Sequence, residues 1–133
     1  AAGLAFGLTV YAVEKNPERA GNLRSNAMEQ GIALEVVEGT IADAMPGMPD
    51  PDYIFFGGGS AELETAFARL RPGGTLVATA VLVETAARLA SSLPEYRTEL
   101  LTLNVSRAGK TAAGEFWRAE NPITIAVFRK KEE

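Results

Sequence analysis

The 133-residue sequence contains no cysteine and no histidine. Without cysteine there is no disulfide and no thiolate chemistry, and without histidine the usual nitrogen ligands for zinc, copper or iron are missing. We therefore expect no protein metal site and no nucleophile that a histidine activates. The lack of cysteine fits a reducing cytoplasm, which is the predicted location.

Long hydrophobic runs and an excess of positive charge are also missing. The longest apolar run, around residues 77–83, is far shorter than the roughly 20 residues that cross a bilayer. Lysine and arginine together number 13 against 17 for aspartate and glutamate, and the net charge of −4 would repel a phosphate backbone. We expect neither a membrane nor a nucleic acid as a partner.

What the sequence does contain is an alternation of short apolar runs and amphipathic stretches. Strands are expected at residues 9–14, 34–37, 53–56, 75–80, 99–106 and 123–129, with helices at 17–30, after Ser60 and at 84–93. Residues 1–8 resemble the end of a helix. Strands that alternate with helices pair in parallel, whereas the last two strands, joined only by a loop, must pair antiparallel. The chain is therefore predicted to be a single α/β domain, residues 1–133, with a mostly parallel sheet and an antiparallel C-terminal hairpin.

The expected core follows from the same segments. The continuous apolar run at residues 53–56 is typical of a strand that helices cover on both faces. In the last strand, alternation places Ile125 and Val127 on one face. Apolar residues at helical spacing predict the inner face of the helix after Ser60: Leu63, Phe67 and Leu70.

The most informative segment is residues 9–18, an apolar strand that ends at Glu14 and turns at once into a helix start. Asn16 suits the N-cap and Pro17 suits the first helical position. In doubly wound folds a ligand lies across the carboxyl ends of the strands, where a carboxylate can accept the hydroxyls of a ribose. Glu14 is either such an acceptor or an ordinary surface residue at a strand end, and this segment alone favours neither.

Three consecutive glycines, residues 57–59, follow the expected strand at 53–56. They do not form a dinucleotide fingerprint, because the third glycine of G-x-G-x-x-G is missing and no acidic residue ends the following strand. They either form a flexible turn or let the backbone approach a ligand closely.

Four segments together carry a resemblance to a known family: VEKNP at residues 13–17, EGT at 38–40, FFGGG at 55–59 and LVATAVLVET at 76–85. They resemble the class I S-adenosylmethionine-dependent methyltransferases and, among these, the decarboxylating precorrin C15-methyltransferases of cobalamin biosynthesis. That domain also occurs as the C-terminal part of precorrin-6Y C5,15-methyltransferases. The resemblance covers nearly the whole chain.

The resemblance implies a Rossmann-like methyltransferase sheet and S-adenosylmethionine as the cofactor. It also implies a tetrapyrrole substrate, a precorrin that is methylated at C15 and loses the carboxyl group of its C12 acetate, and a homo-oligomer, a tetramer in this family. Alternatives are a class I methyltransferase of another small molecule, or a non-catalytic fragment or scaffold of such a domain.

One departure from the family concerns the start of the chain. The glycine-rich loop that follows the family's first strand has no counterpart, since no strand precedes Gly3 or Gly7. The chain is therefore expected to begin within the family's first helix and to lack the family's first strand. That strand lies between those expected here at residues 9–14 and 53–56, whose inner edges would be unpaired.

The resemblance implies roles for individual residues. Glu14 would accept the ribose hydroxyls and Lys15 would flank the adenine edge. The next loop would approach the adenine, and the alternative for that loop is an ordinary strand-to-helix turn. The implied cofactor-binding residues are Glu14, Lys15, Gly39, Thr40, Ile41, Gly57 and Gly58.

The implied substrate carries many carboxylates and needs cationic partners. The implied substrate-binding residues are Gly59, Thr79, Arg107, Lys110 and Arg118, with Phe116 and Trp117 available to lie against the macrocycle. For the charged and aromatic residues between 107 and 118, the alternative is a solvated loop whose two aromatic side chains pack against the sheet edge.

Methyl transfer itself requires positioning rather than a protein nucleophile. Decarboxylation could still use a proton donor or acceptor, for which Glu84 and Thr85 are the candidates. Glu84 could equally be the first-turn acid of its helix.

Overall fold

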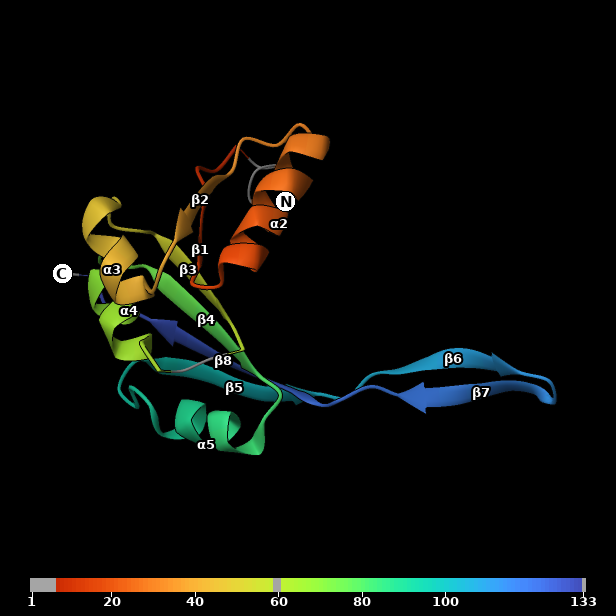
Figure 1. Ribbon diagram of the computed structural model, residues 1–133. Coiled ribbons are helices and arrows are strands. Elements are labelled where there is room, and N and C mark those ends of the chain that lie inside the picture. The colour runs from red at the N-terminus through yellow and green to blue at the C-terminus, as the bar shows by residue number, and fades with distance from the viewer. Residues whose placement is uncertain (1–6, 59–60, 133) are drawn as a thin grey trace. The chain divides into compact units, whose positions relative to one another are not determined.

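The computed structural model describes residues 7–58 and 61–132 (Figure 1). The chain divides into two compact units, Ala1–Pro49 and Asp50–Glu133, and each is described by itself. The hydrogen-bonded ladders of the described residues form three sheets, one in the first unit and two in the second. The expected helix end at residues 1–6, Gly59 and the expected cap Ser60 lie outside the described residues.

The first unit is built on a strand, a helix and a parallel strand: β1 (Tyr11–Glu14), α2 (Pro17–Glu29) and β2 (Glu35–Glu38). Helix α2 begins where the sequence predicts, because Asn16 caps it and Pro17 occupies its first turn. It ends before Gly31, whose φ of 64° lies in the left-handed region that favours glycine.

A short helix, α3 (Ile41–Ala44), and a 3-10 turn, η1 (Met45–Gly47), follow β2. The Thr40 hydroxyl caps α3 by accepting a hydrogen bond from the Asp43 amide at 3.2 Å. The sequence predicted a loop or one helical turn here, and the structure has the helical turn.

The second unit contains a four-stranded sheet in the order β3-β4-β8-β5. Strand β3 pairs in parallel with β4, and β8 lies antiparallel between β4 and β5. Helix α4 contacts β3, and α5 contacts β4 and β8. The bounds are β3 (Tyr53–Gly57), α4 (Leu63–Arg69), β4 (Thr75–Ala80), α5 (Val83–Ser91), β5 (Arg97–Leu103) and β8 (Ile123–Arg129).

One face of this sheet forms the core of the second unit. Its fully buried residues are Leu76, Ala78, Ala80, Ala126 and Phe128. The helices contribute the predicted Leu63, Phe67 and Leu70, together with Leu89. In β8 the buried side chains are therefore Ala126 and Phe128, whereas the predicted pair Ile125 and Val127 is only half-buried on the other face.

Strand β3 differs from the sequence-based expectation. Its side chains alternate between half-buried and exposed, and Tyr53 and Phe55 are 72% and 71% exposed. Among the described residues, therefore, β3 is not covered on both of its faces, although its sequence is a continuous apolar run.

The segment expected as a loop between the last two strands is itself an antiparallel hairpin, β6 (Ser106–Thr111) and β7 (Gly114–Ala119). The expectation of a loop was wrong. Figure 1 shows this blue hairpin projecting beyond the ends of β5 and β8. Its tip is fixed by the Thr111 hydroxyl, which donates to the Gly114 carbonyl at 2.9 Å. The Gly114 φ of 137° suits glycine.

Candidate functional site

The carboxyl ends of β1 and β2 form a corner in the first unit. The two strands run in parallel register, so that Glu14 lies beside Glu38. The Gly39 amide donates to the Glu14 carbonyl at 3.0 Å and extends the pairing by one residue. The predicted residues Glu14, Lys15, Gly39, Thr40 and Ile41 are therefore all gathered at this end of the two strands.

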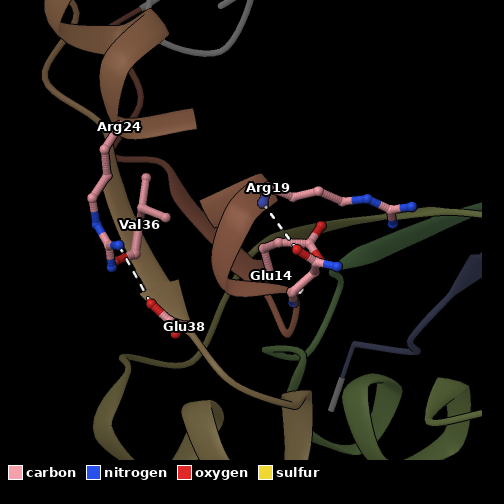
Figure 2. Close-up of polar contacts among 6 residues, drawn as sticks. Glu14, Arg19, Arg24, Val36 and Glu38 are labelled. Atoms are coloured by element: carbon pink, nitrogen blue, oxygen red, sulfur yellow. Dashed lines mark hydrogen bonds and ion pairs between the residues drawn. The ribbon is translucent and has the colours of Figure 1, made fainter. Parts of the chain in front are cut away.

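The Glu14 side chain is held in place by the residue that starts α2. Its Oε1 accepts a hydrogen bond from the Asn16 amide at 3.0 Å, and the Asn16 side-chain oxygen accepts one from the Arg19 amide at 3.1 Å. Figure 2 shows Glu14 beside this first helical turn. Among the described residues, no cation forms an ion pair with Glu14. The half-buried carboxylate thus keeps its charge available to a ligand.

The neighbouring carboxylate has a different environment. Arg24 of α2 approaches Glu38 at 3.5 Å and the Val36 carbonyl at 3.4 Å (Figure 2). Both side chains of this ion pair are about half exposed, so it adds little to stability. It does counter the second negative charge at the corner. No sequence pattern predicted this role for Arg24, because Arg24 and Glu38 lie 14 residues apart along the chain.

The loop after β2 has the features of a tight strand-to-helix turn. Gly39 has a φ of 140°, which strongly favours glycine, and a Cβ there would meet only the Asp43 Cβ at 3.9 Å. Thr40 is occupied with capping α3, and Ile41 is half-buried. Open space beside Gly39 is compatible with a flat ring, but the turn alone also accounts for these residues.

A second corner lies at the carboxyl ends of β3 and β4. Gly57 pairs with Thr79 in register, and the Gly58 amide donates to the Thr79 carbonyl at 3.1 Å. The φ of 79° at Gly58 explains why glycine is needed there. The predicted residues Gly57, Gly58 and Thr79 are thus brought together within the second unit.

The chain leaves β4 through three exposed apolar residues: Val81, Leu82 and Val83 are 55%, 66% and 80% exposed. Runs of exposed apolar residues usually serve a binding function. They lie directly before Glu84 and Thr85, so they belong to the same strand end. The site predicted from the sequence did not include these three residues. An apolar run can be recognised in a sequence, but the sequence does not show which apolar residues stay exposed.

Glu84 and Thr85 lie in the first turn of α5, where Glu84 is exposed and Thr85 is half-buried. The N-cap residue of this helix is Leu82, whose side chain makes no capping hydrogen bond. An acidic residue in the first turn is favourable toward the helix dipole, so the structure is compatible with the simpler interpretation of Glu84 as well.

The predicted cations on the hairpin lie on two faces. Arg107 and Arg118 are cross-strand partners, whereas Lys110 pairs with Glu115 on the opposite face. The three therefore do not form one cluster. Arg107 is bound to Glu120, with 2.5 Å between Nε and Oε1.

The face that carries the two arginines also carries an aromatic ring. The Arg118 guanidinium lies 5.6 Å from the centre of the Phe116 ring, and this ring covers Gly109 on the partner strand. Trp117 is 77% exposed on the other face. This face thus carries two guanidinium groups in one cross-strand row and the Phe116 ring in the next row, with Arg118 beside the ring and Arg107 paired to Glu120. A guanidinium group beside a ring suits a flat anion.

Within residues 7–58 and 61–132, no group of three or more acidic, histidine or cysteine side chains is placed to hold a metal ion. None of the helices in this part is both long and apolar enough to span a bilayer.

Comparison with known proteins adds a family. The sequence pattern of the precorrin methyltransferase domain matches residues 4–130. The chain belongs to this family. A Sinorhizobium precorrin-6Y C5,15-methyltransferase (decarboxylating) is 37% identical over 121 residues, which are 88% of this chain and 29% of that protein. A Sulfolobus acidocaldarius protein named as a cobalt-precorrin-6B C15-methyltransferase (decarboxylating) is 31% identical over 129 residues, 92% of this chain and 67% of that protein.

The precorrin methyltransferase domain fold is likewise found in solved structures. The precorrin-6Y C5,15-methyltransferase structure from Geobacter metallireducens superposes with a TM-score of 0.81 at 26% identity, covering 92% of this chain and 68% of that one. This likeness confirms the predicted α/β methyltransferase fold class. The chain spans less than a third of the Sinorhizobium relative and about two thirds of the Sulfolobus relative.

Proposed function

We propose that this chain is the part of a decarboxylating precorrin methyltransferase that methylates C15 and removes the carboxyl group of the C12 acetate, in cobalamin biosynthesis. The observation that carries the proposal is the family match, which spans residues 4–130 and therefore includes both strand-end corners. The relatives named above bear names of this activity.

The proposed methyl donor is S-adenosylmethionine. Its adenosyl group carries a ribose with two hydroxyls, and Glu14 is a held carboxylate that can accept hydrogen bonds from both. Near the adenine we place four further residues: Lys15, Gly39, Thr40 and Ile41. When bound, this cofactor supplies a methyl group activated on sulfur, so the chain needs no nucleophile of its own.

The second unit would serve the reacting end of the cofactor and the tetrapyrrole. Gly57 and Gly58 offer backbone without side chains at a strand end, and Thr79 lies beside them. The exposed run from Val81 to Val83 suits the apolar rim of a conjugated macrocycle. Thr85 and Glu84 follow directly and remain the candidates for moving a proton during decarboxylation.

The hairpin offers a place for the substrate carboxylates. On one face Arg107 and Arg118 form a cross-strand pair next to Phe116. Arg118 beside the ring, together with Arg107 once it exchanges Glu120 for a substrate carboxylate, would match an anionic conjugated substrate. Lys110 lies on the opposite face and would contact substrate only from that side.

We further propose that the protein is a cytoplasmic homo-oligomer, a tetramer as the family resemblance suggests. A two-stranded hairpin is marginally stable alone in water, and the exposed Trp117 gives it an apolar surface for another copy. Trp117→Ser should therefore lower the mass measured by light scattering. Tyr53→Ser removes an equally exposed aromatic residue elsewhere and should not. An unchanged mass for Trp117→Ser would contradict this role of the hairpin.

The proposed activity is tested by incubating the full natural chain with methyl-labelled S-adenosylmethionine and either a precorrin with the C12 acetate or unrelated small methyl acceptors. We expect label in the tetrapyrrole alone. Label in another acceptor would favour a class I methyltransferase of a different substrate, and no label anywhere would favour a scaffold without catalysis.

A further inference from the structure

We propose that Asn16 is a positioning residue, which orients the Glu14 carboxylate toward the ribose of the cofactor. The inference rests on the proposed function, because it takes an adenosyl cofactor as the ligand of Glu14. Asn16 makes two hydrogen bonds in different directions. Its backbone N–H donates to Glu14 Oε1 at 3.0 Å, and its side-chain oxygen accepts from the Arg19 backbone N–H at 3.1 Å.

The backbone conformation of Asn16 connects the two hydrogen bonds. Asn16 has φ −83° and ψ 118°, the extended conformation of an N-cap residue. The side-chain cap on the Arg19 amide stabilises this conformation. Pro17 also stabilises it, because a residue before proline is restricted to the extended region. The Asn16 N–H lies in the peptide plane that precedes this φ, so the conformation of Asn16 sets how that plane, and the Glu14 carboxylate bound to it, lies relative to the start of α2.

The hydrogen bond from Asn16 leaves most of the carboxylate free. An ionised carboxylate has about four acceptor positions, and the Asn16 amide uses one of them on Oε1. Oε2 and the remaining position on Oε1 stay available for hydroxyls. A side chain that is already held loses less freedom when a ligand binds, so the orientation favours affinity.

A capping residue with no role in binding would differ in one respect. Its removal would loosen α2 and lower stability, but any effect on cofactor affinity would not depend on Glu14. The coupling between the two residues in binding therefore distinguishes a positioning role from a purely structural one.

The experiment measures S-adenosylhomocysteine affinity by calorimetry and stability by denaturant unfolding, on the full natural chain. Asn16→Ala removes the cap and should weaken affinity about three- to tenfold, the range typical of coupled neighbours. Asn16→Ser is the matched control, because serine caps about as well as asparagine, and it should stay within about twofold. In a Glu14→Gln background, Asn16→Ala should cause no further loss of affinity.

Three results would overturn the proposal: unchanged affinity for Asn16→Ala, an equal loss in the Glu14→Gln background, or the same loss for Asn16→Ser despite normal stability. Failure of the proposed function would look different. In that case Glu14→Gln itself would leave the affinity unchanged, or the unaltered protein would not bind S-adenosylhomocysteine, and the positioning role would be refuted with it.

Discussion

Glu14 and Glu38 end neighbouring parallel strands in register, yet their carboxylates have different partners. Glu38 is approached by Arg24, whereas the one hydrogen bond that Glu14 accepts from the described residues comes from the Asn16 backbone amide. Two like charges side by side at a sheet edge repel each other, and Arg24 reduces that repulsion. The carboxylate left uncompensated is the one with a free charge for a ligand.

This difference leads to a prediction about the two glutamates. Glu14→Ala should weaken S-adenosylhomocysteine by about tenfold or more, because losing a charged hydrogen-bond acceptor costs roughly 1.5–3 kcal/mol. Glu38→Ala is the matched control and should change the calorimetric affinity by less than about twofold, as expected for a residue in an exposed ion pair. Equal losses for the two variants would remove the distinction between them.

Two glycines test the packing at the residue scale. A Cβ on Gly74 would lie 2.8 Å from the Arg71 carbonyl oxygen and 2.9 Å from that of Asp52, so Gly74→Ala should destabilise by about 1–3 kcal/mol. Gly21 lies within α2 with open space around it, and Gly21→Ala should stabilise by about 0.5–1 kcal/mol. Denaturant unfolding measures both. A neutral Gly74→Ala would contradict the close packing of the turn before β4.

At the scale of elements, the sequence predicted several strand and helix boundaries correctly. The strands β4 and β8 have the predicted bounds, and α2 starts at its predicted cap. The hairpin β6–β7 was missed because its strands lack alternating apolar residues and contain Gly109 within a strand. Its pairing comes from the tip and from the cover that Phe116 gives Gly109, which are contacts across the strands.

The hairpin geometry separates the predicted substrate cations. Replacing Arg107 and Arg118 together by glutamine should raise the KM for the tetrapyrrole about tenfold or more, since hydrogen bonds to charged groups are worth roughly 1.5–3 kcal/mol each. S-adenosylhomocysteine affinity should stay nearly the same. Lys110→Gln, on the other face, is the control with a smaller effect in the same steady-state assay. If cofactor and substrate binding fall together, the hairpin has a structural role instead.

At the scale of the whole molecule, the sequence predicted the class of fold but not the order of its strands. Antiparallel pairing of the last long strands followed from their short connection. That β8 lies between β4 and β5 depends on which strand edge is free, a property of the assembled sheet. The single-domain prediction remains a prediction. In the ladders of the described residues, β1 and β3 each pair on one side only.

We propose that one protein couples methyl transfer with decarboxylation of the same tetrapyrrole. The most direct test supplies the full natural chain with methyl-labelled S-adenosylmethionine and a precorrin labelled in the C12 acetate carboxyl. We expect equal amounts of label in the C15 methyl group and in released carbon dioxide. Transfer of the methyl group without release of carbon dioxide, or binding of both compounds without either product, would contradict it.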